Sequence, residues 1–219
     1  MEQYKEEFVM LLAKSNCIER GRILRSGRVS PIYFNFSGNL YTGKNIELLA
    51  SYYAHALHGA FKVDEKTVLF GPAMKGIPLA TETASAYARL YQQDLRFAFN
   101  RYKEKEHGEG GMVCGKLEHG DKLIFLDDAF TTGGTIKSLV ERVKEEEQGI
   151  DIAGLLIGID RKEMDGEGYN AAELFAHEQG IKICSVVIID EVIEILEKNS
   201  LLAPEWKEEI ITYRAQYGC

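Results

Sequence analysis

Residues 123–135, LIFLDDAFTTGGT, constrain the fold more than any other stretch of the chain. Four apolar residues at 123–126 predict a buried strand, and Asp127 and Asp128 stand at its C-terminal end. The turn at 131–135 then opens a helix, whose apolar residues recur at helical spacing: Ile136, Leu139, Val140 and Val143. A strand, an acidic pair, a glycine- and threonine-containing turn and a helix together predict an anion site at the carboxyl edge of a parallel sheet.

The turn at 131–135 contains the residue types that bind a phosphate. Backbone N–H groups around Gly133 and Gly134 can converge on one anion, because glycine tolerates left-handed φ and leaves room for oxygens. The hydroxyl donors are Thr131, Thr132 and Thr135. The start of the helix adds about half a positive charge. The turn has no lysine, and the G-x-x-x-x-G-K-[ST] pattern of nucleoside triphosphatases is missing, which favours a phosphomonoester.

Asp127 and Asp128 are placed to hold a sugar diol or to screen positive charge beside that phosphate. Two carboxylates this close resist joint burial, so we expect at least one of them to be solvated or paired. The plainer interpretation is a strand that ends in a solvated acidic pair, followed by an ordinary glycine turn. The complete string is much more specific than its parts, and it favours the sugar-phosphate site.

Composition limits the remaining classes of protein. A chain of 219 residues suits one α/β domain, and a net charge of −8 argues against a nucleic-acid or membrane surface. The cysteines are scattered: Cys17, Cys114, Cys184 and Cys219. They predict reduced thiols in a cytoplasmic protein, without a disulfide framework or a zinc site. An acidic start and the lack of a long apolar run predict neither a signal peptide nor a membrane span.

Apolar segments alternate with helical patterns along the chain. The five expected strands are residues 67–70, 96–100, 123–126, 153–161 and 183–189. Helical patterns precede the first strand, separate most of the others and follow the last, which predicts an α/β fold with a doubly wound parallel sheet of about five strands flanked by helices. We expect residues 1–219 to form a single domain, in which residues 1–40 form a small N-terminal hood.

The hood contains a hairpin with basic and aromatic side chains. Residues 21–35 predict two short strands whose connection carries Arg25 and Arg28. Tyr33 and Phe34 follow, and beside arginines they could serve either as core packing or as a platform for a planar anionic ring. The sequence leaves both interpretations open.

Two further segments are expected at the carboxyl edge of the sheet. Residues 71–78, GPAMKGIP, form a tight loop that can present N–H groups and Lys75 to a second anion, although a rigid connector with a solvated lysine is the alternative. Residues 101–117 are charged and then glycine-rich. A charge run is usually a solvated face, but here the cations and glycines suit a flexible lid loop over an anionic substrate. Arg161 ends the fourth strand at the same edge.

These motifs resemble a known family. Residues 123–135 are similar to the ribose 5-phosphate signature of the type I phosphoribosyltransferases. The combination with residues 26–31, 71–76, 99–101, 107–111 and 159–161 resembles the orotate phosphoribosyltransferases along nearly the whole chain. Adenine, hypoxanthine and uracil enzymes share the central motif but do not normally carry this combination.

The resemblance implies a reaction. Ribose 5-phosphate would pass from phosphoribosyl pyrophosphate (PRPP) to N1 of orotate, giving orotidine 5′-monophosphate and pyrophosphate in pyrimidine (UMP) biosynthesis. Mg²⁺ would be held by PRPP oxygens and water rather than directly by protein ligands. The family also implies a cytoplasmic homodimer, in which the lid of one subunit completes the site of its partner. The substrates would be small molecules, with no nucleic acid or membrane as partner.

The resemblance also implies roles for residues at matching positions. The residues expected to bind PRPP are Arg25, Met74, Lys75, Arg101, Tyr102, Lys105, His107, Asp127, Asp128, Ala129, Phe130, Thr131, Thr132, Gly133, Gly134 and Thr135. The catalytic residues among them would be Lys105, His107, Asp127 and Asp128. The orotate-binding residues would be Tyr33, Phe34, Thr131 and Arg161.

Three positions depart from the family pattern. Arg25 replaces the usual lysine, which keeps the charge but changes reach and geometry. Met74 replaces the usual aromatic residue before Lys75, and Tyr102 occupies a position where a lysine is frequent. Two other functions are a phosphoribosyltransferase for another base and a PRPP-binding regulator of transcription. The regulator should carry a basic face or an added DNA-binding domain, and this acidic chain shows neither.

Overall fold

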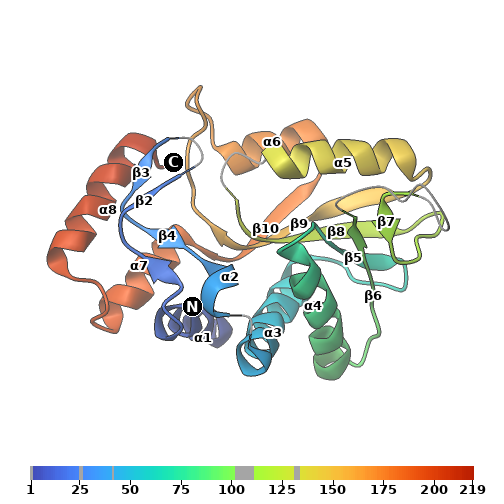
Figure 1. Ribbon diagram of the computed structural model, residues 1–219, viewed down its shortest axis with the longest axis horizontal. Coiled ribbons are helices and arrows are strands. Elements are labelled where there is room, and N and C mark those ends of the chain that lie inside the picture. The colour runs from blue at the N-terminus through green and yellow to red at the C-terminus, as the bar shows by residue number, and fades with distance from the viewer. Residues whose placement is uncertain (1, 25–26, 41, 102–110, 131–133) are drawn as a thin grey trace.

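The structure, a computed structural model, describes residues 2–24, 27–40, 42–101, 111–130 and 134–219 (Figure 1). Within these residues, six strands form a central sheet in the order β10-β9-β8-β5-β6-β7. Their bounds are β5 Thr67–Gly71, β6 Arg96–Asn100, β7 Val113–Cys114, β8 Lys122–Phe130, β9 Asp151–Asp160 and β10 Lys182–Ile188. The predicted parallel sheet is confirmed, and β7 adds an antiparallel edge strand beside β6.

The strands form a sheet because their side chains are apolar on both faces, as parallel sheets covered on two sides require. In β8, Leu123 and Phe125 point into one core, whereas Ile124 and Leu126 point into the other. Every residue of β5 is buried. The buried sheet therefore anchors the loops that leave its carboxyl edge.

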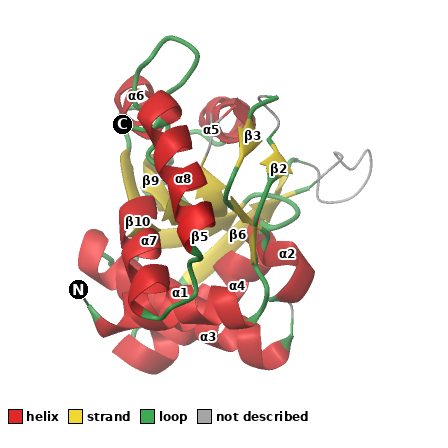
Figure 2. Cartoon of the chain, turned by 90° about the vertical axis from the view of Figure 1, so that its left-hand side faces the viewer, coloured by secondary structure: helices red, strands yellow, loops and turns green. Residues whose placement is uncertain are grey.

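Helices cover both faces of the sheet (Figures 1 and 2). One face packs against α1 (Gln3–Lys14), α3 (Gly43–Ala60), α4 (Gly76–Tyr91) and α7 (Ile189–Lys198). The other face packs against α5 (Gly134–Glu146) and α6 (Ala171–Gln179). The apolar positions Ile136, Val140 and Val143 of α5 are buried, as their spacing predicts. Among the described residues, none of these helices has the length and apolar character needed to cross a bilayer.

Most of the N-terminal hood, residues 1–40, lies beside the sheet and its covering helices (Figure 1). In it, β1 (Ile18–Glu19) pairs with β4 (Tyr33–Phe34), and β2 (Arg22–Ile23) pairs with β3 (Val29–Ser30) as the expected hairpin. A short helix, α2 (Phe36–Asn39), follows, and α8 (Pro204–Tyr217) packs against the hairpin. Trp206 of α8 donates its indole N–H to the carbonyl oxygen of Pro31 at 2.7 Å. Helix α1 differs from the rest of the hood, because its Phe8 and Leu12 are fully buried in the main core.

Strand β8 extends four residues beyond the end that its apolar run predicts. It continues to Phe130 because β9 is long enough to pair with it, with Asp127 opposite Ile157 and Ala129 opposite Ile159. The acidic pair therefore lies inside the ladder of the sheet rather than in the turn after it. Its backbone is fixed by strand pairing.

Candidate active site

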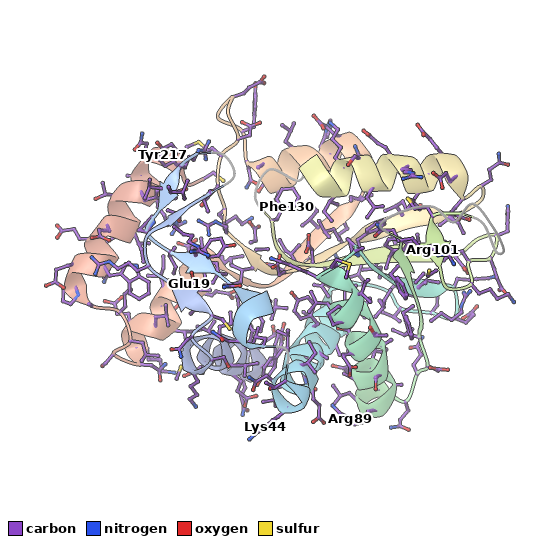
Figure 3. The ribbon with its side chains drawn as sticks, in the orientation of Figure 1. Glu19, Lys44, Arg89, Arg101, Phe130 and Tyr217 are labelled. Carbon is purple, nitrogen blue, oxygen red and sulfur yellow. The ribbon has the colours of Figure 1, made fainter. Side chains whose placement is uncertain are left out.

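The carboxyl ends of the parallel strands bring together the segments that the sequence singles out. The loop after β5, the last residues of β8, the end of β9 and Arg101 after β6 all lie along one edge. Figure 3 labels Arg101 where β6 ends, and Phe130 between the sheet and the layer of α5 and α6. Phe130 is buried and its ring packs 5.4 Å from that of Phe175, so its side chain belongs to the core.

Asp127 and Asp128 form the acidic centre of this edge. The Lys75 ammonium lies 2.8 Å from Asp128 Oδ2, so one carboxylate of the pair is paired, as expected. Asp127 Oδ1 accepts the backbone N–H of Asp128 at 2.9 Å. Burial and the charge of Asp128 raise the pKa of Asp127 to about 7. Partial burial lowers the pKa of Lys75, but the hydrogen bond and charge of Asp128 outweigh it, and the pKa is raised.

The backbone of the acidic pair is held from below by α3. Tyr53 is fully buried and donates its hydroxyl proton to the carbonyl oxygen of Asp127 at 2.8 Å. Gly158 of β9 makes room for this contact, because a Cβ there would lie 2.5 Å from the Tyr53 hydroxyl and 2.7 Å from the Asp128 carbonyl oxygen. Sequence analysis missed both residues. A glycine inside an apolar strand is a signal of close approach and could have identified Gly158.

The loop after β5 is packed closely against β8. A Cβ on Gly71 would lie 2.4 Å from the Gly76 carbonyl oxygen, and one on Gly76 would lie 2.8 Å from that of Leu126. The Gly76 N–H also donates to the Pro72 carbonyl oxygen at 2.8 Å, which closes the turn. This packing places Lys75 over the acidic pair, while the Met74 side chain is 70% exposed.

Arg161 joins the end of β9 to the hood. Its guanidinium is 4% exposed and donates to Glu163 Oε1 at 2.6 and 2.9 Å. It also donates to Ser30 Oγ at 2.8 Å and to the Ile32 carbonyl oxygen at 3.1 Å. Among the contacts of the described residues, one N–H of Nη1 remains for a ligand. Glu163 was not identified from the sequence, because it carries no motif of its own.

The two aromatic residues of β4 have different surroundings. Phe34 is buried in the main core, and the Arg161 guanidinium carbon lies 5.9 Å from its ring centroid. Tyr33 is half-buried, and the Arg22 guanidinium carbon lies 5.5 Å from its ring centroid. Core packing therefore accounts for Phe34, whereas Tyr33 is only partly buried.

Arg101 marks the base of the predicted lid. Its backbone N–H donates to the Met112 carbonyl oxygen at 2.7 Å, which extends the pairing of β6 with β7. Its Nε lies 2.9 Å from Cys114 Sγ, and its Nη1 lies 3.2 Å from the Gly111 carbonyl oxygen. The two ends of residues 101–117 are thus held together at the edge of the sheet.

Several predicted site residues lie outside the described residues: Arg25, Tyr102, Lys105, His107, Thr131, Thr132 and Gly133. The side chain of Thr135 is also outside them, although α5 begins at Gly134. The structure brings Lys75, Asp127 and Asp128 together, and it places Tyr33, Arg101 and Arg161 on segments around the same edge. Ala129 is half-buried in β8.

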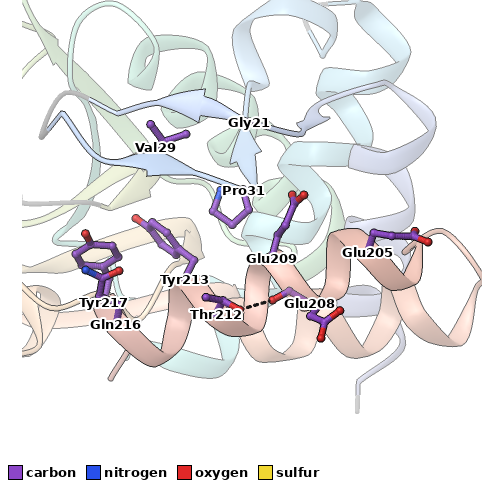
Figure 4. A pocket seen from close by; sticks show the side chains of 10 residues that line it. All are labelled: Gly21, Val29, Pro31, Glu205, Glu208, Glu209, Thr212, Tyr213, Gln216 and Tyr217. Carbon is purple, nitrogen blue, oxygen red and sulfur yellow. Dashed lines mark hydrogen bonds between the residues drawn. The ribbon is translucent and has the colours of Figure 1, made fainter.

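A groove of about 630 Å³ lies elsewhere, between the β2/β3 hairpin and α8 (Figure 4). Its lining residues are Gly21, Val29, Pro31, Glu205, Glu208, Glu209, Thr212, Tyr213, Gln216 and Tyr217. None of them is a predicted site residue. The candidate active site is therefore the carboxyl edge of the sheet, and not this groove.

The mostly parallel sheet, with an acidic pair in β8 and helix α5 beginning at Gly134, is the fold of the type I phosphoribosyltransferases. No family model matches the chain. An orotate phosphoribosyltransferase of Clostridium acetobutylicum is 35% identical over 225 residues, covering 100% of this chain and 99% of its own. One of Vibrio parahaemolyticus is 37% identical over 219 residues and covers 100% of both chains.

Solved structures agree with these relatives. The crystal structure of orotate phosphoribosyltransferase from Francisella tularensis has a TM-score of 0.81 and 28% sequence identity, covering 97% of this chain and 100% of its own. The chain belongs to the orotate phosphoribosyltransferases, a family of pentosyltransferase enzymes.

Proposed function

We propose that this chain transfers ribose 5-phosphate from PRPP to N1 of orotate, giving orotidine 5′-monophosphate and pyrophosphate in pyrimidine biosynthesis. The bond between C1 of the ribose and pyrophosphate breaks, and pyrophosphate leaves with the electron pair. A bond from N1 to C1 forms, and N1 loses its proton to water. The observation that carries this proposal is the Asp127–Asp128 pair with Lys75 at the sheet edge, in a chain that matches the family over its whole length.

Asp127 and Asp128 would bind the ribose hydroxyls and stabilise positive charge as it develops at C1. Fixed carboxylates serve this purpose because their geometry does not change when the charge appears. Lys75 is bonded to Asp128 in this structure. When PRPP binds, its pyrophosphate would take over Lys75, and Asp128 would become available to the sugar. The turn at 131–135 would bind the 5-phosphate through its N–H groups and hydroxyls.

The lid would complete the pyrophosphate site. Arg101 at its base is fixed by β7, and Tyr102, Lys105 and His107 follow it in the chain. Cations that close over the leaving group would neutralise its charge and exclude water. Arg25 in the hairpin and the backbone of residues 129–130 would also contact PRPP.

The orotate would bind between the hood and the acidic pair. Tyr33 offers a ring face, and Arg161 offers one N–H of a guanidinium whose orientation is set by Glu163 and Ser30. Because Glu163 already pairs with the charge of Arg161, this arginine would supply a directed hydrogen bond more than a net charge. Phe34 would support Arg161 from the core, and Thr131 would lie next to the base.

Mg²⁺ would bind mainly through PRPP oxygens and water. This ion keeps several waters and is usually bound by one or two carboxylates together with substrate phosphates. The acidic pair offers such carboxylates, and among the described residues no three metal-binding side chains converge. The ion would supply charge neutralisation for the pyrophosphate.

The proposal extends to the state of the protein in the cell. Residues 1–219 would act as one phosphoribosyltransferase domain and form a homodimer whose lids complete the partner sites, by analogy with the family. The four cysteines, all within the described residues, are free thiols, which suits the cytoplasm.

A substrate panel tests the reaction. Purified protein with Mg²⁺ and PRPP should consume the absorbance of orotate, whereas adenine, guanine and uracil should give no turnover. Activity on a purine together with none on orotate would discard the assigned base.

A further inference from the structure

Asn100 connects two segments that the proposed function uses for pyrophosphate. It is the last residue of β6, and its half-buried side-chain amide lies between the loop after β5 and the base of the lid. Its Oδ1 accepts the backbone N–H of Ala73 at 2.8 Å. Its Nδ2 donates to the carbonyl oxygen of Arg101 at 3.3 Å.

The bond to Ala73 acts on the loop that carries Lys75. At its other end, this loop is held by the bond between Lys75 and Asp128. That contact must be exchanged when Lys75 turns to pyrophosphate. The bond from Asn100 involves neither Lys75 nor Asp128, so it can persist through the exchange and keep the loop in place.

The bond to Arg101 acts on the lid. Asn100 pairs with Val113 across β6 and β7, and Arg101 is bonded to Met112 one residue further. Strand β6 and the segment after β7 are also closely packed, because a Cβ on Gly115 would lie 2.8 Å from the Phe97 carbonyl oxygen. Arg101 and Met112 are therefore held next to Asn100 at the end of this strand pair.

We infer that Asn100 is a positioning residue that holds the 72–75 loop and the base of the lid at a fixed separation. Lys75 and Arg101 can then bind the same pyrophosphate. This inference rests on the proposed function, because it requires that both segments bind pyrophosphate. In the proposed function orotate binds on the hood side, so its binding should not depend on Asn100.

The test is steady-state kinetics of Asn100→Ala in both directions of the reaction. The KM of PRPP and of pyrophosphate should rise roughly threefold to tenfold, the range for loss of one hydrogen bond, while the KM of orotate stays unchanged. Asn100→Ser keeps a polar group at this half-buried position but is too short to reach both partners, so it should give the same pattern if the alanine variant unfolds. Asn199→Ala is the matched control: Asn199 also bonds a backbone carbonyl, that of Ile195 at the end of α7.

A double-mutant cycle with Lys75→Ala separates positioning from general damage. If Asn100 acts through the loop, Asn100→Ala should have a smaller effect on the KM of pyrophosphate when Lys75 is already absent. Equal effects on PRPP and orotate, or full additivity with Lys75→Ala, would overturn the inference. A Lys75→Ala variant with an unchanged KM for pyrophosphate would instead contradict the loop assignment in the proposed function.

Discussion

Asp127 carries an unfavourable charge in the folded protein. Burial and the charge of Asp128 raise its pKa from 3.8 to about 7. The folded state therefore binds this proton more tightly than the unfolded state. The resulting stabilisation is fully present below about pH 4 and is lost as pH rises towards 7. An acid kept in this position despite its cost suits a site that must meet a cation.

Replacing Asp127 with asparagine should stabilise the protein at high pH. The neutral amide removes the buried charge, so Asp127→Asn should unfold about 2–4 °C higher than wild type at pH 8. The difference should shrink as pH falls to 5, where wild-type Asp127 is protonated. Thermal unfolding of both proteins at matched pH measures it, and a difference that is independent of pH would count against the raised pKa.

Gly158 should be needed for both the stability and the activity of the protein, because it lies against the backbone of the acidic pair. A methyl group there would meet Tyr53 and the backbone of Asp128, so Gly158→Ala should cost about 1–3 kcal/mol of stability and lower kcat/KM for PRPP. Gly166→Ala is the matched control, because a Cβ at Gly166 meets nothing within 4 Å. Denaturant unfolding and kinetics of both variants decide the matter, and equal behaviour of the two would refute the role of Gly158.

At the scale of elements, apolar runs and glycine-containing loops predict the parallel strands and their flanking helices, because burial sets the periodicity that sequence analysis detects. The predicted end of this strand was wrong: β8 runs four residues further, because its last part is held by pairing with β9 and not by an apolar pattern. Strand β7 has two residues, too few for any pattern. The contacts of Tyr53 and Asn100 join residues distant in sequence, so no local spacing reveals them, and Glu163 bonds Arg161 only two residues away but carries no motif of its own.

The contribution of the lid to catalysis can be measured with a single substitution. Lys105→Ala should lower kcat by roughly 100-fold or more, the scale for loss of one charge-stabilising donor at a transition state. Lys116→Ala, at the described end of residues 101–117, is the control, because Lys116 is 80% exposed and pairs with Glu118. If Lys105→Ala turned over orotate at the control rate, the lid would have no part in catalysis.

At the scale of the whole molecule, α8 and Arg161 join the hood to the sheet. Trp206 bonds Pro31, Arg20 bonds Glu209, and Arg161 bonds Ser30 and Ile32. These contacts fix the separation of the hood from the acidic pair. The proposed dimer would add the second half of each site, with the partner lid above the edge.

Mixing two inactive variants tests the shared site. Dimers of Lys105→Ala and of Asp128→Asn that exchange subunits form heterodimers. If the lid acts in the partner subunit, each heterodimer has one site in which both Asp128 and the partner's lid are wild type. A 1:1 mixture should then recover about a quarter of wild-type activity, as random pairing in a two-fold dimer requires. Each variant mixed with itself is the control, and no recovery after demonstrated exchange would place the lid over its own subunit.

The most direct measurement is kcat/KM for PRPP, with orotate as acceptor, in the Asp127→Asn/Asp128→Asn double variant. Both changes keep the shape of the side chain and remove the negative charge that would stabilise the ribose cation. We predict a loss of at least about 100-fold in a protein that unfolds no earlier than wild type. A folded double variant that retains near wild-type kcat/KM would contradict the central claim that the acidic pair at the sheet edge is the catalytic centre.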